Sequence, residues 1–513
     1  MFFRKNQYGI PCEDPVKEGE TLTYRNIRCY DVNYGQLVGS FPSFSTLYTL
    51  PEIFLEVSKF FQSRNAICYY QKDGSMNKYL SYKEINHLVF RIASGLCELG
   101  LKPLEFVPLY SENSLWFTIG LWTISYCGSV SVPLSPGTTL LDKIIEKYKC
   151  KYIICSSTTL DSTLTTLSSL KDNSVQTVIV CGIDDELLER KNSDQISLYT
   201  ISSIVQIGKR SNHRPRIPLA TSPAVLQTYG ELDKSILFTH SSVISSSAGL
   251  HACGHSFDTD NYISILSMSN PLERSLQLAV MVGGGCICFP PLAGGTLFDT
   301  FFSFSTLKPS ILLLDSKKLE KIAVFFENEV KDSPFLQRLL FDLSIQILHQ
   351  TSLADTDPPW LIKAMLHAGF GKRFGGELKI IFVCGGRLKP RTHLLIKELA
   401  MTSIVSTLTI PQMHGACCIQ HIKDVSFDTN GAPSLSVEIR LKDIPNSQKN
   451  TSSDSIGEIL IRGPGINVDS TNQSNEWLAT GIAAKLSSNG TLSALGSIYT
   501  FAHDYIESDT SDE

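Results

Sequence analysis

The residue types that act as nucleophiles, general bases or metal ligands are plentiful in this chain, but they do not form the usual motifs. The 14 cysteines and 11 histidines are scattered. The two tightest cysteine pairs, Cys286/Cys288 and Cys417/Cys418, lack the CxxC spacing that zinc sites use. No phosphate loop of the form GxxxxGK[ST] or GxGxxG occurs, and neither HExxH nor GxSxG is present. We therefore predict no metal site.

Composition excludes several classes of protein. The chain has 513 residues, 42% of them hydrophobic, and a formal net charge of −5. A disordered chain would be less hydrophobic and more charged, and a nucleic-acid-binding surface would need a basic excess. At about 150 residues per domain, the length suggests about three domains.

Most cysteines lie in apolar runs, which is typical of a reducing compartment. The N-terminus lacks the apolar run of a secretory signal, so we predict a cytoplasmic protein without a nucleic-acid partner.

The elements that must position any site alternate between strands and helices. The helical spacing is clearest in residues 82–100, where Ile85, Val89, Ile92 and Leu96 repeat every three or four residues. Alternating strands and helices predict an α/β fold with doubly wound parallel sheets. Short apolar runs predict the strands: FVPLYS, SVSVPL, YIICSS, VQTVIVCG, YISILSM, GCICF, SILLLD and LKIIFVCGG.

Two uncharged stretches, residues 115–141 and 275–298, are long enough to cross a bilayer. Both are interrupted, by GSVSVPLSPG in the first and GGGCICFPPLAGG in the second. We favour a buried helix, a turn and a buried parallel strand in each, because such elements are apolar on all faces. A membrane span remains the alternative.

The order of several longer segments resembles a known family. SILSMSNPLERSLQL is similar to its “syLPLaHixERvv” block and keeps Glu273 and Arg274. GEILIRGPGINVDS is similar to “GEIxvRGPxvfxGY”, and FGGELKIIFVCGGRLKP to “lGGrlrxxxsGGApLsP”. The similarity runs from about residue 49 to about residue 499. Over this range the chain resembles the long-chain fatty acyl-CoA synthetases of the adenylate-forming, or AMP-binding, superfamily.

This resemblance implies the large N-terminal domain of adenylate-forming enzymes, with two doubly wound sheet subdomains and a distorted β-barrel subdomain. We expect an N-terminal extension at 1–48, the large domain at 49–495, and a hinge remnant with an acidic tail at 496–513, without the family's small C-terminal domain. In the family, ATP and a fatty acid form an acyl-adenylate, and coenzyme A then displaces AMP. ATP and Mg²⁺ would be the cofactors if the chain is active.

The family's glycine-rich phosphate loop falls on TYGELDKS, which aligns Thr228, Gly230 and Lys234 as nucleotide-binding candidates. Lys234 is also the one candidate for a catalytic remnant. Glu231 and Asp233 are new, and unit charges 4 Å apart repel by about 4 kcal/mol at an effective dielectric of about 20. We favour a surface turn ahead of a helix, with a divergent loop that still uses Lys234 as the alternative.

At further positions where the family binds the metal ion and the ribose, this chain carries residues that cannot make the same interactions. QMHGACC places Cys418 at the metal-associated glutamate and His414 at a tyrosine. Neither suits Mg²⁺, which prefers oxygen ligands, so we favour core or cleft filling for both. Ile482 stands at the ribose-binding aspartate and Ser497 at the ribose-binding arginine. An apolar side chain cannot accept hydroxyl hydrogen bonds, and such a loss typically costs about 1–3 kcal/mol.

The adenine loop and the acyl pocket are partly kept. Gly385 and Gly386 remain as nucleotide-binding candidates, although the loop is one residue shorter. Asn270 replaces a histidine beside the acyl pocket and is our acyl-pocket candidate. We favour a turn residue before Pro271 for Asn270, with the acyl-pocket role as the alternative.

The leading hypothesis is a catalytically impaired synthetase homologue that serves as a binding module. Its ligand would be a fatty acid or acyl-CoA, or its partner an active synthetase. The competing hypothesis is a divergent active ligase completed by another chain, and a truncated gene product is a third. Peripheral contact with the endoplasmic reticulum or another membrane also stays open.

Overall fold

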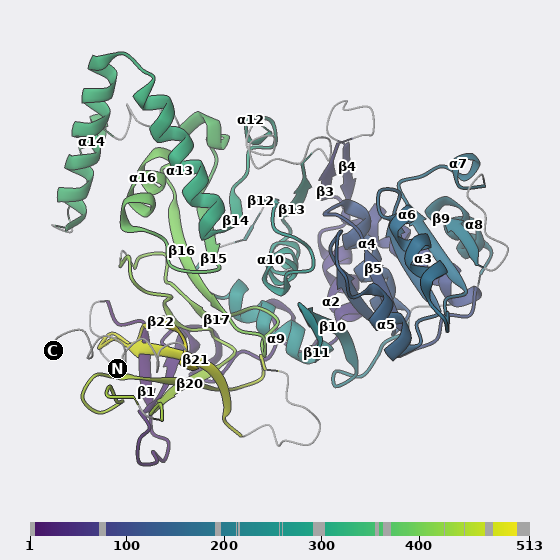
Figure 1. Cartoon of the computed structure of the whole chain (residues 1–513), viewed down its shortest axis with the longest axis horizontal. Coiled ribbons are helices and arrows are strands. Elements are labelled where there is room, and N and C mark those ends of the chain that lie inside the picture. Colours follow the sequence, from purple (N-terminus) through teal and green to yellow (C-terminus); the bar gives the residue numbers. More distant parts are fainter. Residues whose placement is uncertain are drawn as a thin grey trace.

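The computed structural model describes most of the chain. The described residues are 6–70, 78–189, 196–211, 213, 216–255, 257–258, 260–290, 303–353, 356, 359–362, 371–424, 426–445, 447–466 and 476–499. Their strands form three sheets (Figure 1). The seven-stranded sheet lies on the right of the view, and the six-stranded sheet lies at the lower left.

The seven-stranded sheet has the order β11-β10-β6-β5-β7-β8-β9 and is parallel except for the edge pair β10–β11. Four of the predicted strand runs form β5 to β8. The strands are β5 (Phe106–Tyr110), β6 (Val130–Leu134), β7 (Tyr152–Ser156), β8 (Thr177–Cys181), β9 (Ser197–Thr200), β10 (Pro223–Tyr229) and β11 (Glu231–Thr239).

The nine-stranded sheet has the order β18-β17-β16-β15-β14-β12-β13-β3-β4, with parallel pairing from β16 to β3. Its strands are β3 (Asn65–Tyr69), β4 (Lys78–Ser81), β12 (Asn261–Ile263), β13 (Cys286–Phe289), β14 (Ile311–Asp315), β15 (Ile380–Cys384), β16 (Ser403–Thr409), β17 (Ala416–Ile419) and β18 (Ala432–Pro433).

A central helical layer packs between these two sheets. α3 contacts β3 and β4, whereas α4 contacts β5 and β6, and α9 contacts β10, β11 and β17. The layer comprises α2 (Leu50–Phe60), α3 (Tyr82–Glu98), α4 (Leu115–Tyr126), α9 (His240–His251) and α10 (Pro271–Val282). Helix α3 begins at the N-cap Ser81, whose hydroxyl accepts from the Glu84 amide while Glu84 accepts from the Ser81 amide.

The remaining helices cover other faces of the sheets. α5 and α6 contact β5 and β7, and α13 and α16 contact β14 and β16. The predicted α/β arrangement, with helices packed against strands of the seven-stranded and nine-stranded sheets, is therefore present. The bounds are α1 (Cys29–Asn33), α5 (Leu141–Tyr148), α6 (Leu160–Ser169), α7 (Asp185–Glu189), α8 (Ile201–Arg210), α12 (Phe304–Leu307), α13 (Ser316–Lys331), α14 (Phe335–Leu353), α16 (Pro390–Ala400), and the 3₁₀ turns η1 (Pro42–Phe44) and η2 (Gly371–Phe374).

The six-stranded sheet is antiparallel in all its pairs, in the order β1-β2-β19-β20-β21-β22. The predicted N-terminal extension thus contributes two strands to it. β22 also crosses the expected boundary at residue 495, and residues 500–513 lie outside the described residues. The strands are β1 (Gly9–Cys12), β2 (Thr23–Asn26), β19 (Glu438–Lys442), β20 (Ile456–Arg462), β21 (Leu478–Leu486) and β22 (Leu492–Ser497).

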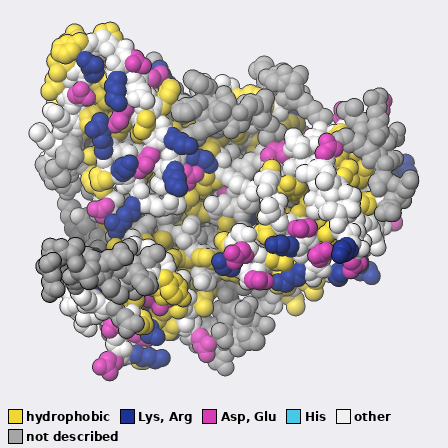
Figure 2. All heavy atoms as spheres, in the orientation of Figure 1, with side chains coloured by type: hydrophobic (Ala, Val, Ile, Leu, Met, Phe, Trp, Pro, Cys, Tyr) yellow, Lys and Arg dark blue, Asp and Glu magenta, His cyan; other side chains and the backbone are white. Residues whose placement is uncertain are grey.

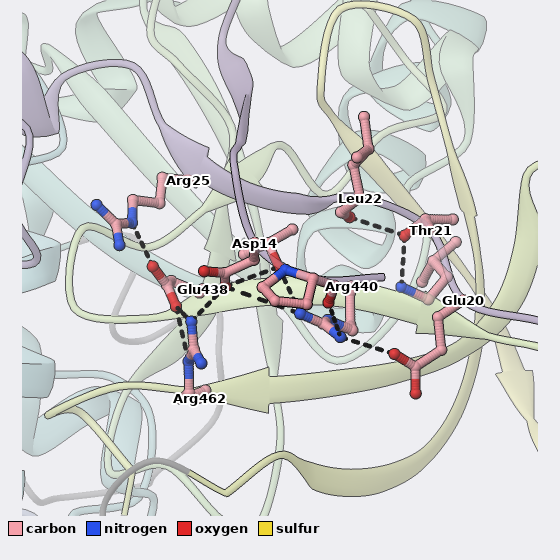
Figure 3. Close-up of polar contacts among 11 residues, drawn as sticks. Asp14, Glu20, Thr21, Leu22, Arg25, Glu438, Arg440 and Arg462 are labelled. Atoms are coloured by element: carbon pink, nitrogen blue, oxygen red, sulfur yellow. Dashed lines mark hydrogen bonds and ion pairs between the residues drawn. The ribbon is translucent and has the colours of Figure 1, made fainter. Parts of the chain in front are cut away.

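Ion pairs join the N-terminal segment to this sheet (Figure 3). Buried Glu438 on β19 pairs with Arg25 on β2, and Arg462 Nη2 on β20 reaches Glu438 Oε2 at 2.6 Å and Asp14 Oδ2 at 2.5 Å. Arg440 Nη1 lies 2.7 Å from Glu20 Oε2. This network holds strands that are more than 400 residues apart in the sequence.

The two long apolar stretches fold as predicted where they are described. The first forms α4, a turn and the buried strand β6, and the second forms most of α10 followed by β13. Residues 291–298 of the second stretch lie outside the described residues. Within the described part of the chain, no helix has the length and apolar character needed to span a bilayer.

Large apolar side chains remain exposed where α13 turns into α14. Phe335 is 70% and Leu336 is 65% exposed, and Figure 2 shows hydrophobic side chains gathered at this tip, at the upper left. Lysine and arginine side chains lie below the tip on the same face (Figure 2).

Candidate functional site

A cleft of about 420 Å³ lies where β10 ends, α10 begins and the chain leaves β16. Its volume falls within the range of small-molecule sites. It contains two of the predicted candidates, Thr228 and Asn270. Its described lining consists of Gln227, Thr228, Tyr229, Ser269, Asn270, Pro271, Leu272, Thr409, Ile410, Pro411, Met413 and Gly415, none of which is charged.

The segment assigned to the phosphate loop is a β-hairpin between β10 and β11. Tyr229 pairs with Glu231 around Gly230, whose φ is +74°. A glycine is favoured there because a Cβ strains the backbone at positive φ. Lys234 Nζ lies 3.0 Å from Glu231 Oε2, and both side chains are about two-thirds exposed. Lys234 is therefore not among the described residues that line the cleft.

Gly230 lines a second hollow of about 360 Å³, which shares Thr228 and Ser269 with the cleft. Its other described walls come from residues 133–140, which are the last two residues of β6 and the segment that follows it. This hollow contains no charged side chain among its described lining residues either.

Asn270 has a structural role beside its place in the cleft. It is the N-cap of α10, and its Oδ1 accepts a hydrogen bond from the Leu272 amide at 2.9 Å. Pro271 occupies the first helical turn, where a missing N–H costs nothing. Asn270 lines this cleft and is not among the described residues that line the smaller cavity beside Arg274, which is described below.

Cys417 and Cys418 lie on β17 with no exposed surface, in the apolar cluster that includes Leu441 and Ile459. The hydrogen bond with Cys417, together with burial, raises the pKa of the Cys418 thiol well above its ordinary value. A neutral thiol is a poor metal ligand. Among the described residues, no group of three or more His, Cys, Asp or Glu side chains could hold a metal ion.

The remaining candidates lie away from the cleft lining. Ile482 on β21 pairs with Ser497 on β22, and Ile482 packs against the apolar cluster of the six-stranded sheet. Gly385 and Gly386 are exposed at the end of β15, and the Gly385 carbonyl accepts a hydrogen bond from Ser316 Oγ at 3.3 Å. The structure thus brings Thr228, Gly230 and Asn270 to the cleft and its neighbouring hollow.

A buried polar cluster behind the cleft was not predicted from the sequence. Arg274 on α10 is 6% exposed. Its Nη2 donates to Gln227 Oε1 at 2.6 Å, its Nη1 donates to the Met268 carbonyl at 2.7 Å, and its Nε lies 3.3 Å from His414 Nε2. The resemblance kept Arg274 without assigning it a role, and that was the only signal in the sequence.

His414 is neutral in this cluster. Burial and the neighbouring Arg274 charge lower the pKa of His414 well below its ordinary value. Since its Nε2 accepts from Arg274, its Nδ1 carries the proton and faces Ser275 Oγ at 3.1 Å. Burial also lowers the pKa of Arg274 to about 9, because the desolvation cost exceeds the gain from nearby negative groups.

Glu273, the neighbour of Arg274, faces a different set of groups. Its Oε1 accepts from Ser264 Oγ at 2.7 Å and from Gln277 Nε2 at 3.1 Å, and its Oε2 accepts from Tyr262 at 2.5 Å. Burial outweighs these hydrogen bonds and raises the pKa of Glu273 to about 7.

A second cavity of about 60 Å³ lies on the inner side of this cluster. Arg274, Gln277 and His414 supply polar groups to its wall, and Trp122 and Met281 contribute apolar surface. A cavity of this size is well below the usual range of ligand sites, at roughly 300–1,000 Å³. It is not a preformed tunnel for a long acyl chain.

Comparison with known sequences gives the family. The sequence model of the AMP-binding enzyme family matches residues 57–467. The chain is 26% identical to fatty acyl-CoA synthetase B of Dictyostelium discoideum over 96% of this chain and 75% of that protein. It is 23% identical to the peroxisomal long chain acyl-CoA synthetase 7 of Arabidopsis thaliana, over 90% of this chain and 66% of that protein.

Solved structures support the fold. A long-chain-fatty-acid-CoA ligase from Archaeoglobus fulgidus superposes with a TM-score of 0.67 at 14% identity, covering 90% of this chain and 88% of that one. The adenylation domain of a carboxylate reductase from Mycobacterium chelonae gives 0.69 at 15% identity, over 88% of this chain and 72% of that one. The predicted adenylate-forming fold is confirmed. The chain belongs to the AMP-binding enzyme family and is a homologue of the long-chain fatty acyl-CoA synthetases.

Proposed function

We propose that this chain is a fatty acyl-CoA synthetase homologue in which ATP-dependent adenylation is impaired, and that it acts as a binding module for an acyl ligand or a partner synthetase. The observation that carries the proposal is the absence of charge from the described lining of the cleft. Phosphate groups and Mg²⁺ are normally held by lysine, backbone amides and carboxylates. No lysine, arginine, aspartate or glutamate lines this cleft among the described residues.

Two departures from the family's pattern support this proposal. The hairpin at Gly230 removes the open glycine-rich loop, and its lysine is paired with Glu231 at the surface. Cys418 occupies the metal-associated position and is enclosed in an apolar cluster. Both changes weaken the hold on the triphosphate and its metal, so they act on the same chemical step.

A divergent active ligase, with ATP and Mg²⁺ as cofactors and another chain completing the site, is the second candidate. The observation in its favour is that the cleft remains about 420 Å³ in volume and is not filled by side chains. The chain also spans 66% to 75% of these two curated relatives, so groups supplied from outside the matched region could take part.

The test is ATP–pyrophosphate exchange with palmitate and Mg²⁺, using fatty acyl-CoA synthetase B of Dictyostelium discoideum as a positive control. We expect exchange at the level of the protein-free blank. Exchange above the blank contradicts the proposal, and its loss in Lys234→Ala would show that the hairpin lysine takes part. Titration calorimetry with ATP alone separates nucleotide binding from turnover.

A further inference from the structure

Helix α14 has two apolar faces, and the rest of the chain covers only one of them. Phe341 and Leu348 are buried in the apolar cluster that contains Leu312 and Ile381 of the nine-stranded sheet, and α14 contacts α13 and α16. The other face is exposed, and Figure 1 shows α14 at the outer edge of the molecule. A surface helix of a globular protein normally turns one apolar face to the core and a polar face to solvent.

The exposed face is a continuous stripe of leucines. Leu336 lies three and four residues before Leu339 and Leu340, and Leu343 lies three or four residues after them, so all four share one side of the helix. Their exposed fractions are 65%, 43%, 43% and 45%, and Phe335, the first residue of the helix, is 70% exposed. Grouped apolar side chains on a surface mark interaction sites, whereas scattered single ones do not.

The stripe is symmetric along the helix. Leu336 and Leu343 are equally far from its midpoint, which lies between the two inner leucines. Arg338 and Asp342 are the only formally charged residues of α14, and they are centred almost on the same point. Both are exposed, and because they are four residues apart they lie along one edge of the stripe.

This symmetry makes the stripe complementary to a second copy of itself. A two-fold axis through the midpoint sets two helices antiparallel, and in such a contact residue i meets residue j and j meets i. Leu336 then packs against Leu343 of the partner subunit, and Arg338 faces Asp342 of the partner subunit in both halves of the contact. Among the described residues neither charge is in an ion pair, and Arg338 lies 5.9 Å from the centroid of the Phe335 ring.

The charges match a lipid surface less well. Helices that lie on anionic membranes are rich in lysine and arginine on their polar face, whereas α14 carries one positive and one negative charge. Three nearby cations, from η2 and the start of α16, are paired with glutamates of α13. One charge of each sign on the same edge favours a second copy of the chain.

We propose that α14 is a self-association surface, through which two copies of this chain pair antiparallel about a two-fold axis between Leu339 and Leu340. The 19-residue helix is about 29 Å long, so a contact made by it alone lies at the small end of specific interfaces. We therefore expect dissociation in the micromolar range. The inference is independent of the impaired-adenylation proposal, because pyrophosphate exchange does not report self-association.

The experiment is sedimentation equilibrium of the full chain between about 1 and 100 µM. We expect the mass to rise from one chain toward two chains with concentration. Leu339→Glu/Leu343→Glu brings carboxylates of both copies together and should weaken the association at least about tenfold. Phe60→Glu, at the exposed last residue of α2, is the matched control and should leave it unchanged. A native chain that stays monomeric at the highest concentration, or unchanged association of the double variant, would overturn the inference.

A charge swap tests the antiparallel arrangement and does not alter the leucines. Asp342→Arg sets arginines against each other in both halves of the contact and should weaken the association at least about tenfold. Arg338→Asp/Asp342→Arg restores opposite charges and should recover most of it. Failure of the swap to recover the association would contradict the two-fold pairing.

Vesicle flotation separates the lipid alternative. The probe is a phosphatidylcholine vesicle that contains phosphatidylserine, and we expect no binding that depends on Leu339 and Leu343. If the native chain is monomeric and binds these vesicles, and Leu339→Glu/Leu343→Glu does not, the face belongs to a membrane and the proposal is wrong.

Discussion

Lys234 forms an ion pair with Glu231, with 3.0 Å between Nζ and Oε2, and the two side chains are 66% and 67% exposed. The residues are three apart on β11, just beyond the turn at Gly230. The lysine that the sequence aligns with a phosphate-binding position therefore faces solvent and an acidic neighbour.

Lys234→Ala should leave stability and nucleotide binding nearly unchanged. An exposed ion pair contributes about 0–1 kcal/mol, and this one lies outside the cleft lining. Urea unfolding and calorimetry with ATP check both expectations. A tenfold loss of ATP affinity in the variant would place the lysine at the nucleotide after all.

Cys418→Glu, which introduces the carboxylate that the family resemblance aligns with this position, should destabilise the chain by about 3 kcal/mol or more. The side chain has no exposed surface and lies among apolar neighbours, so a charge there would be desolvated without a partner. Cys418→Ala is the control and should cost about 1 kcal/mol. Thermal unfolding with and without Mg²⁺ measures both, and stabilisation of Cys418→Glu by Mg²⁺ would contradict a closed core site.

Glu273→Gln should change how stability depends on pH. The folded-state pKa of Glu273 is about 7, above its ordinary 4.5, because burial disfavours the charged carboxylate. The folded protein thus binds more protons than the unfolded chain between these values, and this group's stabilisation, complete below pH 4.5, is lost as pH rises through 7. The slope is on the order of 1 kcal/mol per pH unit.

The glutamine variant cannot ionise and should lack this contribution. The melting temperature of the native chain should therefore fall relative to that of Glu273→Gln between pH 5 and pH 8. Parallel pH profiles for the two proteins would show that Glu273 does not titrate in this range.

Glu438→Ala should destabilise the six-stranded sheet by about 3 kcal/mol, because it leaves Arg25 and Arg462 without their shared, 3%-exposed carboxylate (Figure 3). Glu56→Ala removes a partner from the exposed Lys59–Glu56 pair and should cost less than about 1 kcal/mol. Chemical unfolding compares the two. Equal effects would mean that the network in Figure 3 contributes no more than a surface pair.

Much of the fold followed from local sequence. The structure contains the strands predicted from the apolar runs, and the helix predicted from the spacing of Ile85, Val89, Ile92 and Leu96. Such elements can be predicted because burial of one or both faces of an element makes apolar residues recur in the sequence with a characteristic pattern. The interrupted apolar stretches likewise specified α4 with β6 and α10 with β13. The retained Lys234 and the replacements at Cys418 and Ile482 could be located from the family resemblance, although the resemblance could not say what surrounds these side chains.

The tertiary structure alone decided which polar groups meet. Gln227 is 47 residues from Arg274, and His414 is 140 residues from it, yet their side chains share one buried cluster. No periodicity links such positions, because their contact depends on how α10, the end of β10 and the loop after β16 pack. The sequence determined the family and the elements, whereas packing decided that Arg274 is buried and hydrogen-bonded to Gln227 and His414.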